Sequence, residues 1–154
     1  MQELTDLTVY CLLRDRSEVL TAVKSHGAFL TNELGSEAGT LMLKFDCRTT
    51  ALDRVLDALT ERKLPYHGNY SGGNSCPRGL FCCDGRSFVR CSTAISHYGP
   101  IVTLYADGSV NARQRDEGLR YWRVLTRAQT RIRKATLEPR AKAKPTKRKG
   151  RNRE

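Results

Sequence analysis

Four of the six cysteines fall within one stretch of sixteen residues, and a cluster of thiols can bind a metal, form disulfides or attack a substrate. The stretch reads CPRGLFCCDGRSFVRC and covers residues 76–91. Its spacing lacks the C-x2-C pair through which one turn usually supplies two zinc ligands. It does contain Asp84 and Gly85 between apolar residues, which is a strong hairpin pattern. The stretch therefore predicts a β-hairpin with strands at about 79–83 and 86–91.

The positions of these cysteines on the expected hairpin argue against a single metal site. Adjacent residues of a strand point to opposite faces, which separates Cys82 from Cys83. A two-residue turn puts Cys91 on the face of Cys82 but roughly 13 Å along the strand, at about 3.3 Å per residue. One tetrahedral zinc ion, with zinc–sulfur distances of about 2.3 Å, cannot collect such dispersed ligands. Another register, or a loop that brings a cysteine to His67 or His97, keeps zinc as an alternative for the four thiols Cys76, Cys82, Cys83 and Cys91.

We expect no cofactor, and we expect the thiols to be reduced and mostly buried, because free cysteine behaves as a small apolar residue. A cysteine–histidine pair could act as nucleophile and base. The sequence contains no nucleophile elbow, no phosphate-binding glycine loop and no histidine pair at helical spacing. An enzyme would require Cys76 or Cys82 to meet a histidine in space. We therefore favour a binding protein over an enzyme, and keep a small Cys/His hydrolase or nuclease as an alternative.

The most distinctive pattern is a row of arginines in DEGLRYWRVLTRAQTRIRK, residues 116–134. At about 100° per residue, five cations fall within an arc of roughly 80° on a helix, namely Arg120, Arg123, Arg127, Arg131 and Lys134. Four apolar residues point broadly the other way, namely Leu119, Trp122, Leu125 and Ile132. No acidic residue occurs between Glu117 and Glu138, so the like charges at i+3 and i+4 have no counter-ion in the helix. The pattern predicts an amphipathic helix that Trp122 anchors to the domain and whose arginine face meets an external anion.

Phosphate fits this face best, because a guanidinium group offers two donors to phosphate oxygens. Through residue 110 the chain has 11 Lys/Arg and 12 Asp/Glu, a net charge of −1, whereas from residue 111 it has 16 and 4, a net charge of +12. So one-sided a distribution predicts a polyanionic partner. We expect the phosphate backbone of DNA or RNA to be contacted by Arg113, Arg115, Arg120, Arg123, Arg127, Arg131, Arg133, Lys134, Lys147, Arg148 and Lys149.

Several alternatives stay open at this stage. Base selectivity, if present, would come from Tyr105, Asn111 and Gln114. The sequence does not separate RNA from DNA, because it has neither an aromatic stacking platform nor helix-turn-helix spacing. In the alternative interpretation, this chain is a small inhibitor or adaptor whose α+β domain binds another protein. We expect no membrane partner, because no run approaches 18 apolar residues and the apolar face of the helix is narrow. The acidic start is unlike a secretory signal, which favours a cytoplasmic protein, or a nuclear one in a eukaryotic host.

The remaining sequence must position the helix. Residues 1–73 read as β-α-β-β-α-β, with clean alternation in TLMLKFDC and helical periodicity after it. This order predicts an α+β fold, a ferredoxin-like sandwich in which two helices cover one face of four strands. Residues 74–115 predict two β-hairpins packed on that core, the second with strands at about 100–106 and 109–115 around Asp107-Gly108. An arginine-rich helix is expected at 116–135, and a disordered basic tail at 136–154.

Overall fold

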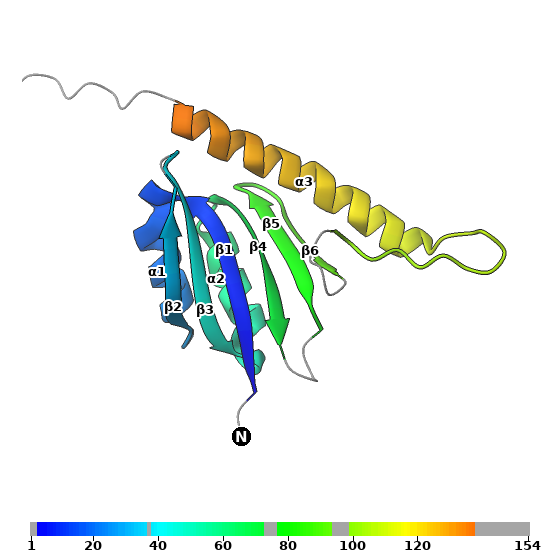
Figure 1. Cartoon of the computed structure of the whole chain (residues 1–154), viewed down its shortest axis with the longest axis horizontal. Coiled ribbons are helices and arrows are strands. Elements are labelled where there is room, and N and C mark those ends of the chain that lie inside the picture. Colours follow the sequence, from blue (N-terminus) through cyan, green and yellow to red (C-terminus); the bar gives the residue numbers. More distant parts are fainter. Residues whose placement is uncertain (1–2, 37, 73–76, 94–98, 138–154) are drawn as a thin grey trace, which may run out of the picture.

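The computed structural model describes residues 3–36, 38–72, 77–93 and 99–137. Six strands form one antiparallel sheet in the order β2-β3-β1-β4-β5-β6 (Figure 1). The strands are β1 (Leu4–Leu12), β2 (Phe29–Gly35), β3 (Thr40–Arg48), β4 (Pro65–Gly72), β5 (Gly79–Asp84) and β6 (Phe88–Ser92). The helices are α1 (Arg16–Lys24), α2 (Leu52–Glu61) and α3 (Ala112–Leu137). None of the helices in these described ranges is long and apolar enough to span a bilayer.

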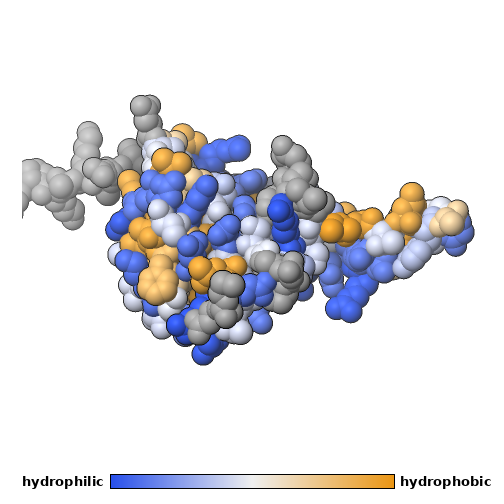
Figure 2. Space-filling model, turned by 60° about the horizontal axis from the view of Figure 1, so that its bottom comes forward, coloured by the Kyte–Doolittle hydropathy of each residue, from blue (hydrophilic) through white to orange (hydrophobic). Residues whose placement is uncertain are grey.

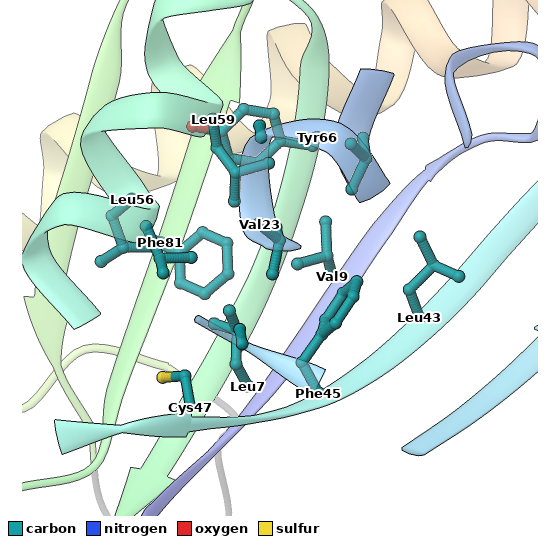
Figure 3. Packing of buried hydrophobic residues seen from close by; sticks show 14 of the residues in the cluster. Leu7, Val9, Val23, Leu43, Phe45, Cys47, Leu56, Leu59, Tyr66 and Phe81 are labelled. Atoms are coloured by element: carbon teal, nitrogen blue, oxygen red, sulfur yellow. The ribbon is translucent and has the colours of Figure 1, made fainter. Parts of the chain in front are cut away.

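The main core lies between one face of the sheet and helices α1 and α2. In β3 the alternating residues Leu41, Leu43 and Phe45 are buried, as the period of two predicts. In α2 the buried residues are spaced i, i+3, i+4 and i+7, which is the apolar stripe of an amphipathic helix. Figure 3 shows side chains from both layers meeting in this core, among them Phe45, Leu56 and Phe81. Each fully buried side chain of this size stabilises the fold by about 1.5–3 kcal/mol.

The first predicted hairpin does not form a separate layer, and this corrects the predicted architecture. Strand β5 pairs with β4 and continues the same sheet. The six-strand order therefore differs from the four-stranded ferredoxin-like topology, although the α+β class is confirmed. The physical reason is that β5 is apolar on both faces: Phe81 and Cys83 belong to the main core, whereas Leu80 and Cys82 face the opposite side. A strand of this kind must be covered on both faces, so it lies inside the sheet.

The register of this hairpin also differs from the predicted one. The predicted two-residue turn would pair Cys82 with Ser87, whereas the observed turn contains four residues and Cys82 pairs with Val89. In the turn the carboxylate of Asp84 accepts hydrogen bonds from the backbone N–H groups of Arg86, at 2.9 Å, and Ser87, at 2.7 Å. A shift of two residues leaves every side chain on its predicted face.

The second predicted hairpin is wrong as a pair of strands. Between residues 99 and 111 the described structure has only two isolated bridges, one of which joins Leu104 to Val110. We call residues 99–111 the arm, because Figure 1 shows this segment projecting beyond the N-terminal end of α3. A two-stranded ribbon without a third strand or a covering helix has little to stabilise regular pairing.

Helix α3 begins at Ala112, four residues before the predicted start. Asn111 explains the difference, since its side-chain oxygen accepts the N–H of Gln114 at 3.0 Å and its backbone oxygen accepts the N–H of Arg115. This is the N-cap arrangement, whereas the predicted helix began at the acidic residues Asp116 and Glu117.

Helix α3 packs on the sheet face opposite α1 and α2, where it contacts β4, β5 and β6 (Figure 1). A second, smaller apolar cluster forms there, made of Leu80, Cys82, Val89 and Cys91 from the sheet and of Tyr121, Val124 and Leu125 from the helix. The predicted basic tail from residue 138 onward lies outside the described residues, whereas the helix extends two residues past its predicted end at 135.

Candidate functional site

The apolar stripe of α3 is rotated from the predicted one. The buried residues of α3 are Gly118, Tyr121, Val124, Leu125, Ala128 and Ile132, of which Tyr121, Val124 and Leu125 cluster with side chains of β5 and β6. Leu119 and Trp122 are instead about half exposed, at 49% and 47%. The prediction that Trp122 anchors the helix is therefore wrong, and Tyr121 takes that place above Cys82, whose Sγ lies 3.7 Å from the Tyr121 backbone oxygen. A Cβ atom at Gly118 would lie 3.3 Å from the Cβ of Pro100, and Ala128 is fully buried, so small residues at both positions permit the close packing that favours this rotation.

All eight Lys/Arg residues of α3 are exposed, and four of them face solvent without an acidic partner in the described residues, namely Arg120, Arg123, Arg133 and Lys134. None of these four forms an ion pair within the described part of the chain. The helix as a whole carries eight Lys/Arg and two acidic residues. Its outer surface therefore keeps an uncompensated positive charge that an anion can neutralise.

The two arginines in the first turn of α3 are paired locally. Arg113 donates to Glu117 and Arg115 donates to Asp116, each through Nε at 3.0 Å. The side chain of Arg113 is 88% exposed. Exposed pairs of this kind contribute only about 0.2–1 kcal/mol, so a phosphate can replace the carboxylate at little cost. Both arginines remain available to an anion.

Two of the predicted phosphate-binding arginines instead bind the protein's own Asp84. Arg127 donates from Nε to Asp84 Oδ2 at 2.6 Å, and Arg131 donates from Nη1 to the Asp84 backbone oxygen. The Asp84 side chain is 5% exposed, whereas that of Arg127 is 56% exposed. The predicted continuous row of cations is thus divided, since these two attach α3 to the end of β5. Sequence alone gave no signal for this contact, because 43 residues separate Asp84 from Arg127.

The pKa of Asp84 is lowered both by the hairpin turn and by this attachment. Burial by itself raises the pKa, but the N–H groups of Ser87 and Arg86 and the guanidinium of Arg127 outweigh it, so the net shift is downward. The carboxylate consequently stays ionised at neutral pH. It holds the hairpin turn with one oxygen and α3 with the other.

The residues predicted to read bases have structural partners. Gln114 accepts the backbone N–H of Thr103 at 2.7 Å and so ties the arm to α3. Asn111 caps the helix and donates from Nδ2 to the Tyr105 hydroxyl at 3.1 Å. These contacts hold the base of the arm in place, and they leave the role of these side chains in base selection as a prediction.

The thiols in the described ranges do not gather into a metal site. The five cysteines there are buried, and none of them forms a disulfide. No group of three or more His, Cys, Asp or Glu side chains in those ranges is placed to hold a metal ion. Cys76 and His97, which the zinc and enzyme alternatives invoked, lie outside the described residues.

One cysteine does lie opposite a histidine, since the β4–β5 register pairs His67 with Cys82. Burial raises the pKa of the Cys82 thiol to about 12 and lowers the pKa of His67. The imidazole also stacks on Tyr10, with ring centroids 4.9 Å apart. A nucleophilic cysteine needs the opposite shift and access to substrate. The arrangement therefore favours packing beneath α3 over catalysis.

The part of the sheet that α3 leaves open is polar. A depression of about 340 Å³ there is lined by Thr8, Lys44 and Asn69, with Asp6 and Asp46 beside them. The two aspartates are direct cross-strand partners, which places two negative charges side by side. This surface repels phosphate, so the outer face of α3 is the better anion-binding surface.

No protein-family model matches the sequence, and no curated protein sequence matches it at a significant level. The function must therefore be argued from the residues of the site and their geometry. The strongest feature of that geometry is the set of exposed cations on α3 that have no ion pair among the described residues.

Proposed function

We propose that the protein binds nucleic acid through its phosphate backbone, using the outer face of α3 and the basic residues that follow it. The single observation that carries the proposal is the set of four exposed cations without an ion pair in the described structure, Arg120, Arg123, Arg133 and Lys134. Arg120 and Arg123 are three residues apart and Arg133 and Lys134 are adjacent, so the repulsion between like charges on one helix disfavours folding slightly. An external polyanion removes that repulsion.

The spacing of these cations suits a run of phosphates. Arg120 and Lys134 are separated by about 20 Å along the helix axis, at about 1.5 Å per residue. Successive phosphates of one B-form strand are about 3.4 Å apart along the axis, so this length matches about six nucleotides. Residues 138–154 add eight Lys/Arg and two Glu directly after the helix. Arg127 and Arg131 have a second role in this proposal, since their contacts with Asp84 hold the helix in place.

The test is the salt dependence of binding to a fluorescent 20-nucleotide duplex DNA and to a single-stranded RNA of equal length. In the variant Arg120→Gln/Arg123→Gln/Arg133→Gln we expect the log–log slope of affinity against salt to fall by about two to three, because each lost phosphate contact removes about 0.9. At low salt the affinity should fall at least about tenfold. Comparing the affinities for the DNA and for the RNA shows which nucleic acid is preferred.

The matched control removes three exposed cations from the other side of the sheet, in the variant Arg14→Gln/Lys24→Gln/Arg54→Gln. Both variants lose three charges, so a difference between them reports location and not net charge. We expect the control to keep the slope of the unmodified protein to within about one. Equal losses in the two variants, or no binding by the unmodified protein at low salt, would contradict the proposal.

A further inference from the structure

The arm exposes an unusual number of large apolar side chains. Five of them lie on the arm itself, namely Ile101, Val102, Leu104, Tyr105 and Val110. Two more, Leu119 and Trp122, lie on the adjoining turns of α3. Figure 2 shows the apolar colour continuing along the projecting arm. A contiguous exposed apolar surface of this kind marks a docking site more often than a solvated loop.

Hydrogen bonds within the arm fix this exposure. Tyr105 N–H donates to the Ser109 oxygen at 2.8 Å, and Gly108 N–H donates back to the Tyr105 oxygen at 3.0 Å. Asn111 N–H donates to the Thr103 oxygen at 2.9 Å. These bonds fix the shape of the outer part of the arm and leave its apolar side chains exposed, while Thr103 and Gly99 at its base lie against Gln114 and Trp122 of α3. A surface held in this way is preorganised for a partner.

The charge of the arm indicates which partner it fits. Asp107 is the only Asp, Glu, Lys or Arg residue within 99–111, and the outer face of α3 carries an excess of Lys and Arg. Hydrogen bonds from the side chain and backbone N–H of Ser109 hold the pKa of Asp107 below its usual value. The arm thus combines apolar residues with one fixed negative charge. The first half of α3 combines Leu119 and Trp122 with positive charges, which makes the two surfaces complementary.

We propose that two copies of the chain associate by exchanging arms, so that each arm lies along Leu119 and Trp122 of the other copy's α3. A two-fold arrangement suits the two surfaces because both belong to one chain and each copy supplies both. In this contact Asp107 approaches Arg115 and Arg123 of the other copy. The interface is rich in apolar and aromatic side chains at its centre and charged at its rim, as stable protein interfaces are.

The net charge of +11 opposes this association at low salt. Salt screens that repulsion, with a Debye length of about 8 Å at physiological ionic strength, and leaves apolar contacts intact. Association through the arms therefore strengthens or holds as salt rises from about 0.05 to about 0.5 M. Nucleic-acid binding weakens over the same range. The two proposals make opposite salt predictions, and either can fail without the other.

The experiment is sedimentation velocity of the full chain at concentrations from about 1 to about 200 µM, with fluorescence of the single tryptophan measured on the same samples. We expect a concentration-dependent dimer and a shift of Trp122 emission to shorter wavelength as the other copy's arm covers the indole. The variant Val102→Gln/Leu104→Gln should remain monomeric with unshifted emission. Its fold should be unaffected, because both side chains are exposed. The circular dichroism spectrum checks this.

The matched control changes two exposed leucines outside the patch, in the variant Leu34→Gln/Leu137→Gln, and should dimerise like the unmodified protein. A third variant, Asp107→Lys, keeps the apolar residues and should weaken the dimer about three- to tenfold. An unmodified protein that stays monomeric throughout would overturn the proposal. A dimer that survives the arm variant, or that leaves Trp122 emission unchanged, would overturn it as well.

Discussion

The chain contains two Asp-Gly turns that have similar backbone geometry but lie between different kinds of structure. Gly85 and Gly108 both adopt left-handed backbone conformations, with φ of +86° and +84°. In both turns the aspartate side chain accepts hydrogen bonds from residues just after it. The first turn joins two strands of the six-stranded sheet, whereas the second lies in an arm without regular strands. The dipeptide specifies the turn, and burial of the flanking residues decides whether strands form.

The largest difference between the two regions should be seen in their apolar residues. Phe81, in the strand before the first turn, is fully buried, whereas Leu104, before the second turn, is 69% exposed. We expect Phe81→Ala to lower the free energy of unfolding by about 3–5 kcal/mol, because it leaves a cavity in the core. Leu104→Ala should change it by no more than about 0.5 kcal/mol. Urea unfolding of both variants measures the difference, and similar losses would contradict the comparison.

The next largest difference in the free energy of unfolding is expected between the aspartates of the two turns. Asp84→Ala removes two turn hydrogen bonds and the contact with Arg127, and should lower the free energy of unfolding by about 2–3 kcal/mol. Asp107→Ala removes contacts only in an exposed turn, and its effect should stay within about 0.5 kcal/mol. Thermal unfolding at equal salt measures both. A loss for Asp107→Ala as large as that for Asp84→Ala would show that the arm is part of the cooperative fold.

The pH dependence of stability sharpens the role of Asp84. Its pKa in the folded protein lies below the unfolded value of about 3.9, so its contribution is complete above about pH 5 and is lost as pH falls through the folded pKa. The stability difference between the unmodified protein and Asp84→Asn should therefore shrink below about pH 4. A stability difference of equal size at pH 3 and pH 7 would show that the charge of Asp84 does not stabilise the fold.

The smallest expected difference concerns the two glycines. A Cβ atom at Gly85 would lie 2.8 Å from both the Lys63 backbone oxygen and Arg131 Nη1, whereas one at Gly108 would meet nothing within 4 Å. Both Gly→Ala variants carry the left-handed penalty of about 1–2 kcal/mol, but only Gly85→Ala adds a clash with the backbone. Gly85→Ala should therefore be the less stable by about 1 kcal/mol. Equal melting temperatures of the two variants would show that the first turn shifts to accommodate the added Cβ atom without a loss of stability.

The sequence predicted the parts of the fold that depend on local periodicity. Alternation in β3 and the spacing of leucines in α2 identified the main core, and the Asp84-Gly85 pattern identified the first hairpin. A helix with an outward cationic face was also predictable from its arginines. Each of these features needs only residues that are neighbours along the chain.

The features that were missed depend on contacts between distant segments. The rotation of α3, with Tyr121 inward and Trp122 outward, is set by which residues fit closely on β5 and β6. The attachment of Arg127 and Arg131 to Asp84 requires β5 to end beneath α3. A helix pattern gives the width of an apolar face but not its exact centre, so neither contact was accessible from spacing alone.

The most direct test follows the arginine Nε–Hε signals by nuclear magnetic resonance while a short duplex DNA or single-stranded RNA is added at low salt. The signals of Arg120, Arg123 and Arg133 should shift most, because these side chains are exposed on α3 and have no ion pair in the part of the chain that the structure describes. Those of Arg14 and Arg54, on the opposite side of the sheet, should shift little. Shifts concentrated on that opposite side, or no shifts with either nucleic acid, would contradict the proposed role of α3.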